Sequence, residues 1–157
     1  MTYQQAVAFL YEQLPAFQRV GAPAYKADLN NITQLCEALE NPQSQYPIIH
    51  VAGTNGKGSV CHMLSSILQE AGYTVGLHTS PHLLDLRERM KVNGAMAPEQ
   101  FVIDFLQDHQ SVIDELKPSF FELTVAMSFD WFRKSQVDIA VIETGLGGRL
   151  DSTNIVE

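Results

Sequence analysis

The chain has 157 residues, of which 45% are hydrophobic and 18% are charged, and its formal net charge is −8. This length and composition are typical of one globular domain with a real core and exclude a disordered chain, while the acidic balance excludes a general nucleic-acid surface. No run approaches the roughly 18 apolar residues of a membrane span and no signal-peptide pattern opens the chain, so we expect a cytoplasmic protein without membrane partners.

The first two predicted elements are helices. The spacing of Thr2 and Gln5 is that of a capping box and predicts a helix that ends near Pro15. A loop that contains glycine and proline follows over residues 19–27. Asp28 then opens a second helix, and its carboxylate is interpreted either as the N-cap of that helix or as a group that faces a ligand.

An apolar strand over 47–52, which we expect to be buried on both faces of a parallel sheet, runs into a glycine-rich loop. Strand, glycine loop and helix form the layout of a phosphate-binding loop, because glycine lets N–H groups approach phosphate oxygens and Lys57 reaches the terminal phosphates. The loop is unusual, since Gly58 stands where Ser or Thr is expected. The alternative is an Asn-Gly turn with a surface lysine. The candidate nucleotide contacts are Gly53, Thr54, Asn55, Gly56, Lys57, Gly58 and Ser59.

The helix after this loop and a second strand over 73–79 complete a βαβ unit, so we expect the two strands to run parallel. The predicted buried face of the helix consists of Val60, Met63, Leu64, Ile67, Leu68 and Ala71. The next loop begins with Ser80 and carries His82 and two arginines, and it lies beyond a strand end, where open α/β sheets bind ligands. Alternatively, His82 is an ordinary loop histidine and the arginines pair with Asp85 or Glu88.

Two further helices and a short hairpin are predicted next. Asn93-Gly94 favours the hairpin, and a helix then begins at Pro98 with a bend expected at 108–110. Ser119 and Glu122 repeat the capping-box spacing before a helix that is apolar almost all round, so we expect this helix to lie deep in the protein. Glu122 is interpreted mainly as a carboxylate that stabilises the N-terminus of its own helix.

A third apolar strand over 136–143 ends at Glu143, and a second glycine-rich loop follows over 145–154. An acidic residue at a strand end is typical of a Mg²⁺ ligand in a chain that also has a phosphate loop. The alternative is a solvated carboxylate. Three parallel strands with covering helices predict an α/β fold with three layers, α/β/α, around a mostly parallel sheet that is incomplete at its C-terminal end.

Four blocks together resemble the folylpolyglutamate synthase and dihydrofolate synthase family of the Mur ligase superfamily, in the family's order: residues 53–59, 80–83, 121–124 and 143–151. Gly58-Ser59 is this family's form of the loop, whereas the related Mur ligases carry Lys-Thr at the equivalent of Lys57-Gly58. The resemblance implies ATP-dependent amide formation, with Mg²⁺, in which L-glutamate is added to folate or dihydropteroate through an acyl phosphate.

The resemblance also implies roles for individual residues. Lys57 and Glu143 are the implied catalytic residues, and Ser80 and Glu143 are the implied Mg²⁺ ligands. The implied contacts to the acceptor substrate are Asp28, Leu29, Pro81, His82, Arg87, Phe121, Glu122, Leu123, Thr124, Leu150, Asp151 and Ser152.

On this resemblance, residues 1–157 are the N-terminal part of an ATP-binding domain. The family's further metal-binding histidine, modified lysine and C-terminal glutamate-binding domain are not in this sequence. We therefore expect weak nucleotide affinity and little or no ligase turnover from this chain, and a monomer at full length. Two other functions stay open, a Mur-type peptide ligase domain and a nucleotide-binding regulatory module without ligase activity.

Overall fold

The computed structural model describes residues 1–14 and 28–156, so the loop predicted over 19–27 lies outside the described residues. The α-helices are α1 (Tyr3–Gln13), α3 (Asn30–Ala38), α4 (Lys57–Glu70), α5 (Glu99–Asp108), α6 (Gln110–Leu116) and α7 (Phe120–Lys134). Two short 3-10 helices are η2 (Pro42–Ser44) and η3 (Leu86–Arg89). The strands are β1 (Ile48–Val51), β2 (Val75–His78), β3 (Lys91–Val92), β4 (Ala95–Met96) and β5 (Ile139–Glu143). None of the helices in the described ranges is long and apolar enough to cross a membrane.

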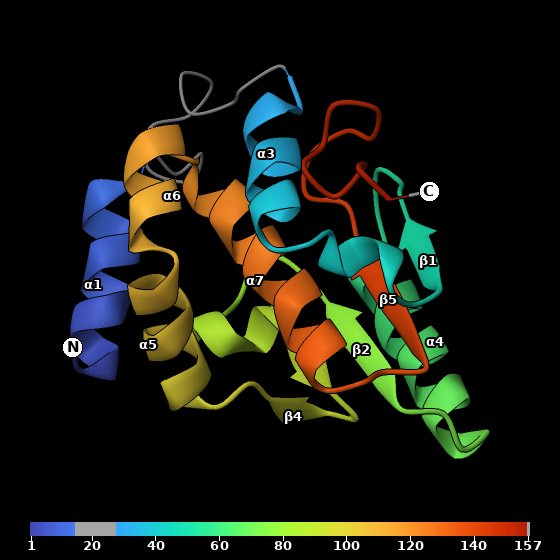
Figure 1. The fold of residues 1–157 in the computed structure, drawn as a ribbon. Coiled ribbons are helices and arrows are strands. Elements are labelled where there is room, and N and C mark those ends of the chain that lie inside the picture. The colour runs from blue at the N-terminus through green and yellow to red at the C-terminus, as the bar shows by residue number, and fades with distance from the viewer. Residues whose placement is uncertain (15–27, 157) are drawn as a thin grey trace.

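The five strands form one sheet in the order β1-β5-β2-β3-β4 (Figure 1). The first three strands of this order run parallel, and β3 and β4 form the predicted hairpin as an antiparallel pair. The strands of the predicted βαβ unit are parallel, but β5 lies between them. Since parallel strands end at the same edge, Glu143 stands between the loops that follow β1 and β2.

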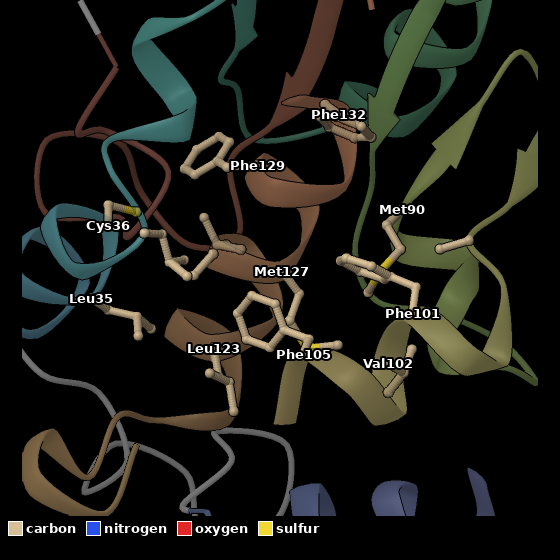
Figure 2. Packing of buried hydrophobic residues seen from close by; sticks show 14 of the residues in the cluster. Leu35, Cys36, Met90, Phe101, Val102, Phe105, Leu123, Met127, Phe129 and Phe132 are labelled. Carbon is tan, nitrogen blue, oxygen red and sulfur yellow. The ribbon is translucent and has the colours of Figure 1, made fainter. Parts of the chain in front are cut away.

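Helices cover both faces of the sheet, which confirms the predicted three layers. α4 packs on one face, where Cys61 joins Val75, Leu77 and Val141 in a small buried cluster. The larger core lies on the other face, where α3, α5 and α7 meet (Figures 1 and 2). The predicted bend near 108–110 is the junction between α5 and α6 at His109.

α7 is the central helix of the larger core, as its all-round apolar sequence predicts. Its N-terminus carries the predicted capping box, in which Ser119 and Glu122 each bond the other's backbone N–H. The Phe132 ring lies beside β2 (Figure 2), and a Cβ added at Gly76 would stand 2.7 Å from it. Glycine at this position therefore lets helix and strand approach closely.

Two predictions about burial are wrong. Val60, Met63 and Ile67 of α4 are 41%, 57% and 64% exposed, while Cys61 and Ser65 face the sheet. Gly58, Cys61 and Ser65 share one face of the helix, and this face is the one turned toward the sheet, with Gly58 beside Glu143. β1 is only half-buried along its length because it is the edge strand of the described sheet, not a central one.

Candidate functional site

The phosphate-loop residues lead directly into α4. Gly56 is the N-cap with φ 78°, a left-handed conformation that favours glycine, and no side chain caps the first turn of the helix. Its backbone N–H groups are therefore available to an anion, which the helix dipole also favours. The ammonium of Lys57 donates a hydrogen bond to the carbonyl oxygen of Gly53 at 3.0 Å, which holds the lysine over the loop.

Glu143 brings the three sequence motifs together. Its Oε2 accepts a hydrogen bond from the backbone N–H of Ser80 at 2.9 Å, and its Oε1 lies 3.5 Å from where a Cβ of Gly58 would stand. Only 5% of Glu143 is exposed. The end of β5, the first turn of α4 and the loop after β2 thus meet at one carboxylate. A Cβ at position 58 would be in ordinary van der Waals contact with that carboxylate, and glycine leaves this side of it uncovered.

The oxygen donors at this point fit Mg²⁺. One carboxylate and one hydroxyl residue, Glu143 and Ser80, stand beside the phosphate loop, and Mg²⁺ commonly uses one or two protein ligands with phosphate oxygens and water. The neighbouring Thr144 hydroxyl is buried without a hydrogen-bond partner. Within the described residues no group of three or more His, Cys, Asp or Glu side chains forms a complete metal site.

The loop after Ser80 is organised by Glu88. Its carboxylate accepts hydrogen bonds from the N–H groups of Leu83 and Leu84, both at 2.9 Å, and of Asp85 at 2.8 Å. These backbone donors lower the pKa of Glu88 to about 2. These bonds tie the tip of the loop to Glu88, while the side chains of Leu83 and Leu84 are 88% and 95% exposed and Pro81 is also exposed.

The two arginines of this loop have different environments. Arg87 pairs with Asp85 at 2.7 Å and its guanidinium carbon lies 5.0 Å from the centre of the Tyr3 ring, which is the ion-paired alternative considered above. Arg89 is 2% exposed and has no carboxylate within ion-pair distance in the described part of the chain. Burial lowers the pKa of its guanidinium to about 10. Arg89 was absent from the predicted contacts, because sequence spacing does not show which arginine is paired.

His82 contacts Arg89 directly. The Nε–H of Arg89 donates to His82 Nδ1 at 2.7 Å, and the other ring nitrogen of His82 shares a hydrogen bond with the hydroxyl of Tyr11 on α1. The ring of Phe120 lies 5.1 Å from the guanidinium carbon of Arg89. His82 is thus part of a polar cluster and not an isolated loop histidine.

Phe121 and the second glycine loop, predicted on the same side of the site, are in contact. A Cβ at Gly145 would stand 2.4 Å from the Phe121 ring, so the ring lies directly on this glycine. Asp151 is 2% exposed, and its carboxylate accepts hydrogen bonds from the N–H groups of Gly145, Leu146 and Thr153 and from the Thr153 hydroxyl. Asp151 therefore organises the loop, whereas Leu150 is exposed and Ser152 half-buried.

The remaining predicted contacts have local structural partners. Asp28 accepts a hydrogen bond from the N–H of Asn30 at 2.9 Å, but the N-cap of α3 is Leu29, so the predicted N-cap role of Asp28 is wrong by one position. Leu29 also packs against the core. Glu122 accepts from the N–H of Ser119 at 2.6 Å, and it is buried. Leu123 and Thr124 are fully buried in the interior. Of the 121–124 block, only Phe121 is partly exposed beside the second glycine loop.

Comparison with known proteins gives one consistent group of relatives. No family model matches the chain. The chain is 42% identical over 139 residues to dihydrofolate synthase/folylpolyglutamate synthase from Bacillus subtilis, covering 84% of this chain and 32% of that protein. It superposes on folylpolyglutamate synthase from Thermotoga maritima with a TM-score of 0.88 and 41% identity, covering 99% of this chain and 36% of that one. It matches an FPGS-AMPPCP-folate complex with a TM-score of 0.88 and 35% identity, covering 99% of this chain and 38% of that one. The chain thus spans about a third of the length of these relatives.

Proposed function

The chain belongs to the folylpolyglutamate synthase and dihydrofolate synthase family, and on this premise we propose that it supplies the nucleotide-binding part of an ATP-dependent ligase. The proposed reaction joins the amine of L-glutamate to a carboxylate of folate or dihydropteroate. The observation that carries the proposal is the position of Glu143, whose carboxylate touches both the phosphate loop at Gly58 and the backbone of Ser80.

We assign the ATP phosphates to the N-terminus of α4. The uncapped first turn offers backbone N–H groups, and Lys57 exchanges its bond with the carbonyl of Gly53 for a phosphate oxygen. Glu143 and Ser80 would hold Mg²⁺, which supplies positive charge to the phosphate oxygens during transfer. Gly58 leaves the side of the Glu143 carboxylate that faces α4 uncovered, where the metal would bind.

We assign the acceptor substrate to the surfaces around Phe121 and Arg89. Phe121 presents a partly exposed aromatic ring beside the second glycine loop, suited to an aromatic heterocycle. Arg89 is a buried cation without an acidic partner in the described residues, and a guanidinium is suited to a substrate carboxylate. Arg87, which the sequence favoured, is already neutralised by Asp85.

In the proposed reaction a carboxylate oxygen attacks the γ-phosphorus of ATP, the bond from that phosphorus to the bridging oxygen breaks, and ADP leaves. The glutamate amine then attacks the acyl carbon, loses a proton and displaces phosphate. Lys57 and the loop N–H groups stabilise the negative charge that develops on the transferring group. We further propose that the protein works in the cytoplasm as a monomer and binds small molecules rather than macromolecules.

The test is ATP hydrolysis measured with each substrate present or omitted, in a protein that contains this chain and is extended to the length of its relatives. We expect ADP to form over many turnovers only when the acceptor, folate or dihydropteroate, and L-glutamate are both present, because the acyl phosphate is consumed by the amine. Mass spectrometry should then show a product one glutamate longer. Hydrolysis indifferent to both substrates would instead identify a nucleotide-binding regulatory module. The 157-residue chain alone is expected to show little or no turnover.

A further inference from the structure

We propose that Tyr11 on α1 is a positioning residue that, through His82, aims the guanidinium of Arg89 at the carboxylate of the acceptor substrate. This inference rests on the proposed function, since it names the residues that prepare one of its binding groups. Tyr11 lies in a segment far from the four sequence blocks, and no motif singled it out.

The hydrogen bonds that link Arg89, His82 and Tyr11 all have the same donor-to-acceptor direction, from Arg89 to His82 and from His82 to Tyr11. Arg89 is always a donor, so His82 Nδ1 must accept its Nε–H at 2.7 Å and carries no proton. The neutral ring then bears its proton on Nε2, which donates to the hydroxyl oxygen of Tyr11. Arg89 therefore sets the tautomer of His82, and the hydrogen bond to Tyr11 holds the ring in the orientation that suits Arg89.

Aromatic packing on Phe120 fixes two of these residues, Tyr11 and Arg89, from another side. The ring of Tyr11 stacks on Phe120, with centroids 5.1 Å apart and planes 25° from parallel, and the guanidinium of Arg89 lies over the same Phe120 ring at 5.1 Å. Phe120 is the first residue of α7 and is buried, so the platform is rigid. Arg89 is thus held on one side by an aromatic face and at Nε by His82.

This arrangement leaves the terminal nitrogens of Arg89 as the donors for a ligand. No carboxylate of the described residues lies within ion-pair distance of them, and a buried guanidinium without a counter-ion costs free energy in the empty protein. A carboxylate that binds both terminal nitrogens recovers this cost, and the fixed guanidinium plane favours such a bidentate contact. Because Tyr11 and His82 fix that plane before binding, they reduce the entropy lost on binding.

The first experiment measures the Nε–H signal of Arg89 by NMR in the 157-residue chain, with Arg89→Lys used to assign it. Tyr11→Phe keeps the ring and its stacking on Phe120 but removes the hydroxyl. We expect this variant to shift the Nε–H signal of Arg89 and to increase the rate at which this proton exchanges with water roughly 3-fold or more. The reason is that the hydrogen bond between Tyr11 and His82 is lost. Tyr73→Phe, at a 50% exposed tyrosine outside the site, is the matched control and should change nothing.

The second experiment measures the Kd of folate in the presence of Mg²⁺ and AMPPCP. We expect Tyr11→Phe to raise the Kd of folate roughly 3- to 10-fold and to leave the Kd of AMPPCP unchanged. His82→Asn keeps an acceptor near the Nδ1 position and should lose less affinity than His82→Leu. In the His82→Leu background, Tyr11→Phe should have no further effect, because Tyr11 acts only through His82.

Additive effects of Tyr11→Phe and His82→Leu would overturn the inference, since they would indicate two independent structural roles. The inference would also be overturned if Tyr11→Phe changed neither the Kd of folate nor the Nε–H signal of Arg89. Those outcomes leave the proposed function intact. If the wild-type protein does not bind folate even when it is extended to the length of its relatives, both the proposed function and this inference are wrong.

Discussion

At the scale of single residues, Glu143 determines how the phosphate loop is built. A carboxylate with 5% exposure needs donors or a cation around it, and in the described structure the N–H of Ser80 is its hydrogen-bond donor. The remaining oxygen faces Gly58. The same arrangement of atoms leaves the carboxylate uncovered on the side of Gly58 and provides the site proposed for Mg²⁺.

Glu143→Gln should separate the charge of this residue from its shape. The amide oxygen can still accept the N–H of Ser80, so we expect the melting temperature to change little. The affinity for nucleotide in the presence of Mg²⁺ should fall by roughly 10-fold or more, because the metal loses its charged ligand. Calorimetric titration with AMPPCP, with and without Mg²⁺, checks this. Equal loss of affinity in both conditions would contradict a role in metal binding.

Glu88 gives a prediction about pH at the tip of the loop after β2. Its pKa is lowered from 4.5 to about 2, chiefly by the backbone N–H of Leu83. A carboxylate with a lowered folded-state pKa stabilises the fold at pH above its ordinary value and loses this contribution as pH falls. We therefore expect the amide shifts of Leu83 and Leu84 to stay constant down to about pH 4 and to change with a midpoint near 2. Glu88→Gln should abolish this transition, and a midpoint near 4.5 in the wild type would contradict the hydrogen-bonded loop.

At the scale of elements, the contact between α7 and β2 is made through one glycine. Phe132 is fully buried, and its ring occupies the space that a side chain at Gly76 would take. Helix and strand can therefore pack more closely here than at any position with a Cβ. This contact holds the C-terminal end of α7 against the sheet, while at its other end Phe121 lies on Gly145.

Gly76→Ala should therefore destabilise the protein by about 1–3 kcal/mol, because its Cβ would stand 2.7 Å from the Phe132 ring. Gly148→Ala is the matched control, since nothing lies within 4 Å of a Cβ there, and it should be nearly neutral. Urea unfolding followed by circular dichroism measures both. Combining Gly76→Ala with Phe132→Leu should recover part of the loss; equal stability of the two alanine variants would disprove the close packing.

At the scale of the whole molecule, the chain spans about a third of its relatives, and α4 carries three exposed apolar residues, Val60, Met63 and Ile67. Large exposed apolar side chains close together on one helix commonly mark a contact surface. The phosphate loop, the Glu143 carboxylate and the loop after β2 are nevertheless assembled within the described residues. Nucleotide binding is thus a property that can be measured on this chain, separately from ligation.

We expect Mg²⁺ and AMPPCP to raise the melting temperature of the chain. A ligand at about 100 times its Kd stabilises a protein by about 2.7 kcal/mol, which corresponds to roughly 5–10 °C for this size. Lys57→Ala should remove the rise at the same nucleotide concentration. The protein extended to the length of its relatives should bind nucleotide at least about 10-fold more tightly, as expected if the chain holds only part of the site. Equal affinities would contradict that view.

The local features of the fold could be predicted from the sequence alone. Capping boxes, the turn at Asn93-Gly94 and the glycine at the start of α4 depend on residues three or four positions apart, so their signals are complete within short windows. The alternation of strands and helices likewise predicted three layers with parallel strands. The motif blocks, each at a strand or helix end, also indicated which loops would meet.

Only the tertiary structure decided the rest. The place of β5 between β1 and β2 and the rotation of α4 depend on pairings between segments far apart in the chain. Distant contacts also decide that Arg87 is ion-paired with Asp85 whereas Arg89 is bonded to His82. Tyr11, which holds His82, is far from this loop in the sequence and reaches it only in the folded chain. The sequence by itself determined the elements and the kind of chemistry, because these depend on neighbouring residues. Which side chains are buried, paired or left for a ligand depends on distant contacts, which the folded chain alone establishes.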